Sequence, residues 1–367
     1  MRRIASIFWN GEERRLRALW RVGLQFGAFV VPVVMLARAF SGALYTELGE
    51  TLFEFLETAG FGFGSVLLAS RLWDRRPLAD LGFNLNRDWF RDWAFGLLVG
   101  AVSMCGIWVV EYAAGWVVVV EHHAWPQDSR LNMSFPVQAV FCGAVALSEE
   151  SICRMYQLRN IAEGLVCGRI GPRAALIGAW VLSSVGFALP HIGNPGATWL
   201  STMGVFLAGL MQALPVLITG SLAVPFGLHI TWNFFQGPVL GFPVSGMSMG
   251  KSLISLEQFG PEFWTGGACG PEAGMLGWLA VGMSAAAILF YHQRVYGTVE
   301  FRRELVVAPR LRGCVSAPLG VEIAAGLAAE IGGGSVPEAS EYAVDSITPT
   351  QPSQEADAAG RTGEEVS

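Results

Sequence analysis

Long apolar runs separated by short polar segments dominate the first 300 residues of this 367-residue chain. A helix of about 20 apolar residues spans the hydrocarbon core of a bilayer, so each run of that length predicts a membrane span. There are about eight such runs, and we expect an all-α polytopic membrane protein built as a helix bundle. The runs cover residues 18–40, 51–71, 93–120, 134–160, 173–193, 197–219, 221–240 and 273–292.

The composition supports the same class of protein. Hydrophobic residues make up 52% of the chain and charged residues only 15%, with a mean hydropathy of +0.44. Soluble domains carry about 25% charged residues, so this chain lacks the polar side chains that would cover a water-facing surface. A soluble enzyme, a disordered protein and a nucleic-acid binder are excluded. The expected surroundings are the lipid bilayer.

Arginine is distributed unevenly over the segments that connect the runs. Loops rich in Lys and Arg stay on the cytoplasmic side of a membrane, so the alternation predicts that both termini are cytoplasmic, in the plasma or inner membrane of a cell. The rich segments are the N-terminus, 71–92, 159–173 and the residues after the last run; the poor ones are 41–50, 121–133 and 241–272, which together hold only Arg130 and Lys251.

The same patterns divide the chain into three parts. A basic cytoplasmic arm over residues 1–17 precedes a membrane domain over 18–304, and residues 305–367 form an acidic cytoplasmic tail. Residues 315–367 contain nine acidic residues and one basic residue, a net charge of −8, so the rest of the chain is +2. Low hydrophobicity and high charge predict that this tail is largely disordered, with one short helix near Gly320–Ile331.

Glu149, Glu150 and Arg154 interrupt the fourth apolar run. Such groups are costly inside a membrane span, so each marks a candidate functional position. Glu150 and Arg154 are four residues apart on one helix and are expected to form an ion pair. Glu149 points about 100° away from Glu150, which leaves it free to face a cavity. The alternative is that all three are a structural polar cluster that holds helices together.

Two further motifs place polar side chains in apolar runs. Phe187 and His191 stand at the end of the fifth run, and His229 and Asn233 share one helix face in the seventh. Each alone is compatible with a hydrogen bond between packed helices. Together with Glu149 they are the groups needed to activate a water and stabilise an oxyanion. The sequence therefore predicts an intramembrane polar cavity within residues 134–240.

These motifs resemble those of a known family. Glu149-Glu150-x-x-x-Arg154, Phe187-x-x-x-His191 and His229-x-x-x-Asn233 are similar to the three motifs of the CPBP intramembrane proteases. That family includes the CAAX prenyl protease type 2 enzymes and the Abi-like bacteriocin-processing or bacteriocin-immunity proteins. Three motifs in this order, each in an apolar span, are a specific signal. The resemblance implies an endopeptidase that hydrolyses a peptide bond of a membrane-associated protein or peptide.

The resemblance also implies roles for the individual residues. Glu149 and His191 would position and deprotonate a water, while His229 and Asn233 would hold the oxyanion. Glu150, Arg154 and Phe187 would support these four catalytic residues. A divalent metal such as zinc, held by Glu149, His191 and His229, is an alternative that the sequence leaves open, because two His and one Glu form a known catalytic zinc site.

Two questions remain open at this level. A non-catalytic scaffold or immunity protein of the same fold, or a transporter that uses Glu149, His191 and His229, would carry the same polar residues. In addition, His191 lies about 27 Å along a helix that begins at Arg173, further out than the other site residues. Either this helix begins deep in a cytoplasmic cavity, or Pro190 breaks it and the chain re-enters the membrane.

Overall fold

The computed structural model describes residues 7–11, 13–39, 47–120, 134–250 and 252–308. The chain divides into two units, residues 1–314 and 315–367, and the second lies wholly outside the described residues. The acidic tail, apart from residues 305–308, and its predicted helix near Gly320–Ile331 are therefore not described. The same holds for the predicted loop 121–133 and for Lys251.

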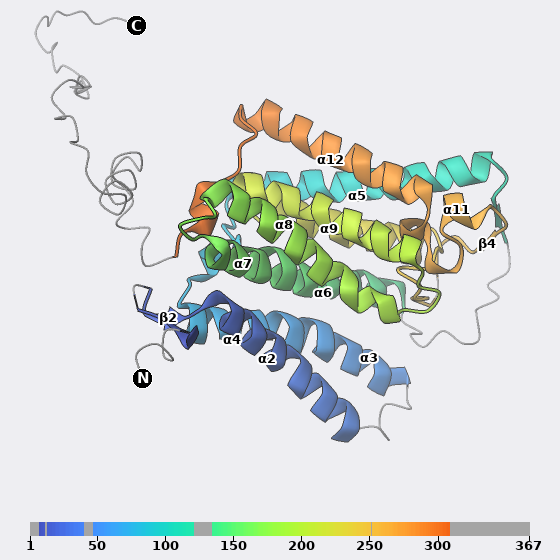
Figure 1. The fold of residues 1–367 in the computed structure, drawn as a ribbon. Coiled ribbons are helices and arrows are strands. Elements are labelled where there is room, and N and C mark those ends of the chain that lie inside the picture. Colours follow the sequence, from blue (N-terminus) through green and yellow to red (C-terminus); the bar gives the residue numbers. More distant parts are fainter. Residues whose placement is uncertain (1–6, 12, 40–46, 121–133, 251, 309–367) are drawn as a thin grey trace, which may run out of the picture. The chain divides into compact units, whose positions relative to one another are not determined.

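Helices form most of the described part of the first unit (Figure 1), which confirms the predicted all-α polytopic membrane fold. Two short antiparallel strand pairs accompany them: β1 (Trp9–Asn10) with β2 (Arg15–Leu16), and β3 (Val117–Val119) with β4 (Leu256–Gln258). The α-helices are α2 (Ala18–Ala39), α3 (Glu47–Phe55), α4 (Gly64–Ala69), α5 (Arg87–Ala113), α6 (Phe135–Glu150), α7 (Leu158–Leu165), α8 (Pro172–Ala188), α9 (Trp199–Thr219), α10 (Ala223–Phe234), α11 (Glu262–Thr265) and α12 (Met275–Tyr296).

Shorter helical turns join several of these helices. π-helical turns over Leu56–Phe63, Ser70–Asp74, Ser151–Gln157 and Phe235–Val239 extend α3, α4, α6 and α10, and 3₁₀ turns cover Leu78–Leu81, Leu189–Gly193, Gly267–Cys269, Pro271–Ala273 and Arg303–Val306. The segment from Phe135 to Leu165 is thus helical without interruption, with a widened π-helical stretch directly after Glu150. Such stretches are frequent at functional sites because they turn the following side chains relative to a regular helix.

Six helices of the described unit are long and apolar enough to cross a membrane. Large apolar side chains on their outer faces are exposed, for example Leu19 on α2 (79%) and Met283 on α12 (67%). A water-soluble protein does not expose continuous surfaces of this kind, whereas lipid covers them at no cost. The six spans are 18–39, 52–74, 87–113, 172–193, 199–219 and 275–296.

The other two predicted runs, 134–160 and 221–240, are helical but are not apolar spans of this kind. The first contains Glu149, Glu150 and Arg154, and the second begins as the 12-residue helix α10. Both pack inside the bundle, with α10 against α5 and α6. The third predicted run also ends earlier than expected, at Ala113 instead of residue 120. Gly115, with a φ of 68°, turns the chain there, and Val117–Val119 then pair with β4.

Glycines let α10 approach α5 closely. A Cβ atom added at Gly100 of α5 would lie 2.4 Å from the carbonyl oxygen of Leu228, and one added at Gly227 of α10 would lie 2.3 Å from that of Trp93. Neither position has room for a larger side chain. Small residues allow this backbone contact between membrane helices, and the contact fixes α10, the helix that carries His229 and Asn233.

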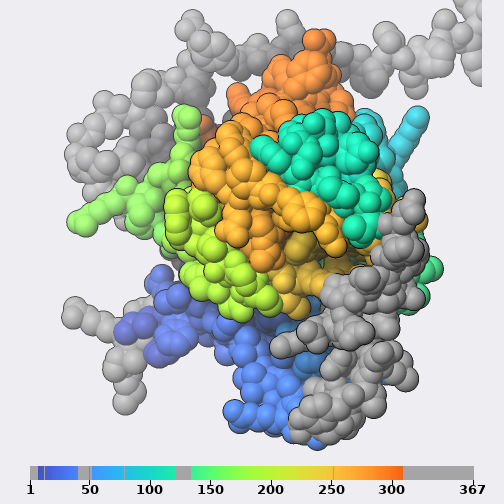
Figure 2. Space-filling view, turned by 90° about the vertical axis from the view of Figure 1, so that its right-hand side faces the viewer, coloured from blue at the N-terminus to red at the C-terminus, as the bar shows by residue number. Residues whose placement is uncertain are grey.

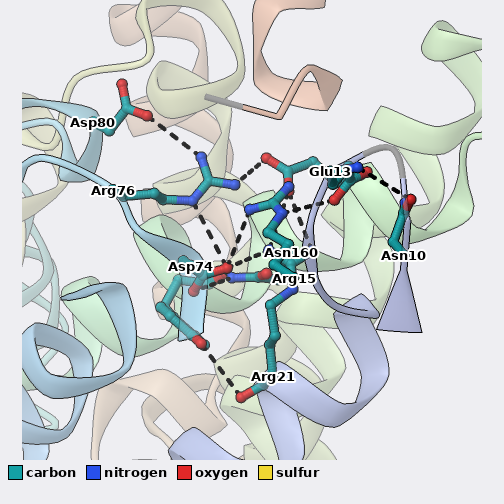
Figure 3. Close-up of polar contacts among 10 residues, drawn as sticks. Asn10, Glu13, Arg15, Arg21, Asp74, Arg76, Asp80 and Asn160 are labelled. Carbon is teal, nitrogen blue, oxygen red and sulfur yellow. Dashed lines mark hydrogen bonds and ion pairs between the residues drawn. The ribbon is translucent and has the colours of Figure 1, made fainter. Parts of the chain in front are cut away.

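A buried ionic cluster joins the N-terminal arm to the bundle (Figure 3). Arg21 pairs with Asp74, and Arg76 pairs with Glu163. Arg15, from β2, donates a hydrogen bond of 2.6 Å from Nη2 to Glu163 Oε2. All five side chains are at most 4% exposed. Although burial alone would raise the pKa of Glu163, the charges of Arg76, Arg15 and Arg21 lower it to about 2.

Breaking this cluster is expected to destabilise the protein strongly. Glu163→Gln leaves three buried guanidinium groups opposite one fully buried carboxylate, and removal of one partner from a buried ion pair costs about 3–5 kcal/mol. The free energy of unfolding at pH 7, measured in mixed micelles, tests this. Asp88→Asn is the matched control, because Asp88 and Arg91 form an ion pair with side chains 62% and 44% exposed, which contributes at most about 1 kcal/mol. Equal losses in the two variants would contradict the role assigned to the cluster.

Candidate active site

Glu149 and Glu150 end α6 and face different surroundings. The side chain of Glu150 is completely buried, whereas that of Glu149 is 33% exposed. Adjacent residues of a helix point about 100° apart, which accounts for the difference between two chemically identical groups. Glu150 lies between neighbouring helices, and Glu149 lies at the wall of a cavity.

His229 of α10 lies between these two carboxyl groups. Its Nδ1 atom donates a hydrogen bond of 2.7 Å to Glu150 Oε1, and its Nε2 atom is 3.7 Å from Glu149 Oε2. Because Nδ1 carries the hydrogen that Glu150 accepts, a neutral imidazole presents a lone pair at Nε2. Donation from Nε2 into the cavity therefore requires a hydrogen on both ring nitrogens.

Arg154 completes the surroundings of Glu150. Its Nε atom is 3.2 Å from Glu150 Oε2, so the expected ion pair within the helix is present. The guanidinium also donates from Nη2 to Gln212 Oε1 at 3.1 Å and lies 3.9 Å from the centre of the Phe187 ring. Planar stacking on an aromatic ring suits a guanidinium that is cut off from water. Arg154 thus connects α6 with α8 and α9.

His191 lies in the 3₁₀ turn Leu189–Gly193 that follows α8. Pro190 has no N–H to continue the α-helical pattern, so the α-helix ends at Ala188. The chain then runs through the 3₁₀ turn and the segment 194–198 into α9. His191 Nδ1 donates 2.9 Å to the carbonyl oxygen of Phe187. The Phe187 ring is 5.2 Å from the ring of His191 and 6.2 Å from that of His229, so both imidazoles flank it.

The four residues predicted as catalytic line one cavity of about 210 Å³. Glu149, His191, His229 and Asn233 contribute to its wall, as does Phe187. Glu150 and Arg154 do not, because they are buried behind Glu149 and His229. The cavity therefore extends from α6 and α10 to the end of α8. Because of this length, His191 lines the same cavity as Glu149 and His229 although it lies further along its own helical segment.

The polar residues of this wall that were not identified from the sequence include Gln212 and Glu272. Gln212 of α9 is nearly buried, and its Oε1 atom accepts from Arg154. Glu272 accepts from Gln236 Nε2 at 2.6 Å and from the backbone N–H of Ser245 at 3.1 Å. A lone amide in an apolar span is a signal that could have indicated Gln212. Glu272 stands in a turn of Gly and Pro before α12, where no periodicity marks it.

A shared metal ion does not fit these side chains. Within the described ranges, no group of three or more His, Cys, Asp and Glu side chains is arranged to hold an ion. Glu149, His191 and His229 therefore line a common cavity without forming the zinc ligand set that their residue types allow.

The fold and this cavity define an intramembrane site of polar residues within an apolar helix bundle. Residues 132–235, which include all three motifs, match the family model described as Type II CAAX prenyl endopeptidase Rce1-like. This part of the chain is thus similar to the Rce1-like domain, which is consistent with the CPBP family. No curated protein and no solved structure matches the chain significantly.

Glu272 is expected to make stability depend on pH. Burial, only partly offset by hydrogen bonds from Gln236 and Ser245, raises the pKa of Glu272 to about 7 from 4.5. The folded protein then holds a proton between these values that the unfolded chain releases, so the free energy of unfolding falls as the pH rises from about 5 to 7. Glu272→Gln should flatten this part of the profile, measured as the unfolding midpoint in detergent. Glu163 does not interfere, because with a pKa of about 2 it acts below pH 4.5. Parallel profiles of the wild type and the variant would contradict the assignment.

Proposed function

We propose that the protein is an intramembrane endopeptidase of the CAAX-protease type, which hydrolyses a peptide bond of a membrane-associated protein or peptide. The observation that carries the proposal is the convergence of Glu149, His191, His229 and Asn233 from three separate helical segments on one cavity. A purely structural polar cluster would leave no exposed carboxylate beside an imidazole. The match to the endopeptidase family model supports the same reaction class.

In the proposed reaction Glu149 is the general base. Its carboxylate takes a proton from a water as the water oxygen adds to the carbonyl carbon of the peptide bond. The carbonyl π electrons move to the oxygen, which becomes an oxyanion. When the C–N bond breaks, the proton on Glu149 passes to the leaving nitrogen, and the products are a carboxyl group and an amine. His191, whose Nδ1 donates to Phe187, keeps Nε2 as an acceptor that helps to orient the water.

His229 and Asn233 are proposed to stabilise the oxyanion. Asn233 contributes an amide donor, and His229 in its imidazolium form donates from Nε2 while Nδ1 remains bound to Glu150. Donors held in place before the reaction, where water is scarce, stabilise a developing negative charge more than mobile solvent does. The role of Glu150 is then that of a positioning residue, which accepts the Nδ1 hydrogen and so orients the imidazole.

The proposed function also requires a membrane and an orientation of the chain in it. We place the helices in the plasma or inner membrane of a cell with both termini in the cytoplasm. This follows from the alternation of Arg-rich and Arg-poor connecting segments. The partners expected from this setting are lipid and a membrane-associated protein or peptide substrate.

Replacing the base tests the reaction directly. Glu149→Gln should lower the rate of cleavage by about 10²- to 10⁴-fold, because the water loses its proton acceptor. The measurement uses the purified full chain in lipid nanodiscs and two quenched fluorescent peptides that end in Cys-aliphatic-aliphatic-X, one farnesylated and one not. Glu111→Gln is the control, since Glu111 is a fully buried carboxyl of α5 bound to Gln258 at 2.8 Å. Cleavage that survives in Glu149→Gln would refute the mechanism.

Gln212 gives a second test. The Oε1 atom of Gln212 accepts a hydrogen bond from Arg154. Because a guanidinium has no acceptor, the amide nitrogen of Gln212 is turned away from Arg154. We expect this nitrogen to donate to a backbone carbonyl of the substrate. Gln212→Glu keeps the acceptor for Arg154 but removes the donors, and should raise KM about 3- to 10-fold with little change in kcat. An unchanged KM in this variant, with activity lost only in Gln212→Met, would show that Gln212 acts only through Arg154.

A further inference from the structure

Basic residues gather at one end of the described helices. Four Arg lie within residues 14–21, five within 71–91, three within 159–173 and three within 294–303. These segments hold the starts of α2, α5 and α8 and the end of α12, at the left of Figure 1. Several of these arginines, such as Arg15 and Arg76, also form buried ion pairs.

The opposite end carries almost no positive charge. Its described connecting segments, residues 114–120, 190–198, 240–250 and 252–274, contain no Lys or Arg, and Arg38 at the end of α2 is the exception among the described residues of this end. Over the whole sequence, the loops assigned to this side add only Arg130 and Lys251. A difference of this size between short loops is the property that sets the orientation of a membrane protein.

The cavity lies in the half of the bundle that ends at these Arg-poor segments. Asn194, Ser245, Met247 and Glu272 of this end contribute to its wall, whereas no residue of the four Arg-rich ranges does. Figure 2 views the unit from this end and shows residues near 195 beside those near 265. Hydrogen bonds join these segments around the cavity: Asn194 Nδ2 donates to the carbonyl oxygen of Ser245 at 2.8 Å, and the N–H of Gly246 donates to that of Cys269 at 2.7 Å.

From this placement we propose that the cavity faces the side of the membrane away from the cytoplasm, and that its substrates present their cleavable bond from an extracytoplasmic loop or the outer half of a span. The second part rests on the proposed protease function, and the first does not. A cytoplasmic C-terminal tetrapeptide would have to pass the Arg-rich end and the buried Glu150–Arg154 layer to reach Glu149. An extracytoplasmic segment would reach the same cavity past Asn194, Ser245 and Met247, which line it at this end.

Thiol labelling of intact cells decides the first part. Cys167, an exposed native thiol, lies in the Arg-rich connection between α7 and α8, and Ser248 is exposed in the segment that borders the cavity. A membrane-impermeant maleimide is applied to cells that express one of two variants. The first, Cys314→Ser, keeps Cys167 as the thiol to be labelled. The second combines Ser248→Cys with Cys167→Ser and Cys314→Ser, so that position 248 is labelled instead. We expect Ser248→Cys to be labelled in intact cells, with at least tenfold more label than Cys167, and Cys167 to be labelled only after permeabilisation. Equal labelling of both, or labelling of neither before permeabilisation, would overturn the proposal, as would the reverse pattern.

Mapping of new protein termini decides the second part. Membrane proteins of cells with the wild-type chain are compared with those of cells with Glu149→Gln. Termini that depend on Glu149 should fall in extracytoplasmic loops or outer halves of spans, and their location in cytoplasmic tails would overturn the substrate class. The complete absence of such termini would instead refute the protease function, while the labelling result would still decide which way the cavity faces.

Discussion

The buried carboxylate of Glu150 determines how the candidate site is arranged. A carboxylate without contact to water is stable only when it is paired and hydrogen-bonded, and Glu150 meets this requirement with Arg154 on one oxygen and His229 on the other. Each partner brings a constraint of its own. Arg154 stacks on Phe187 and donates to Gln212, and His229 is held with Nε2 toward Glu149. The positions of Arg154 and His229 beside the cavity therefore follow from the need to neutralise the buried charge of Glu150.

The same requirement operates at the Arg-rich end, where Asp74 and Glu163 are buried among Arg15, Arg21 and Arg76. This cluster connects β2 and α2 with the π-helical turn after α4 and with α7. The segment from α6 to α7 is thus anchored at its Arg-rich end by Glu163 and, one π-helical stretch earlier, by Glu150. Two fixed points along one continuous helical segment restrict its rotation, and that rotation decides whether Glu149 or Glu150 faces the cavity.

The sequence predicted the fold class well because membrane helices need continuous apolar length, which is visible residue by residue. It says less about a helix with polar content: the runs with Glu149 to Arg154 and with His229 are helical as expected, but they pack inside the bundle and are not among the six described helices that are long and apolar enough to cross a membrane. It also missed the turn at Gly115 and the pairing of Val117–Val119 with β4. The i,i+4 spacing gave the Glu150–Arg154 pair, but the contacts of Gln212 and Glu272 join residues 58 and 27 positions apart, and local periodicity carries no information on such contacts.

The position of Glu149 shows why the scarcity of charge is informative. Near the middle of a membrane protein every polar atom must either find a protein partner or face a water-accessible space. The side chains of Glu150, Arg154 and Gln212 each have at least one protein partner. Glu149, by contrast, is one third exposed at a cavity wall and lies 3.7 Å from the Nε2 atom of His229. A carboxylate kept in that position has a water-accessible space beside it, and the imidazole and amide groups around the space are those that the hydrolysis of a peptide bond requires.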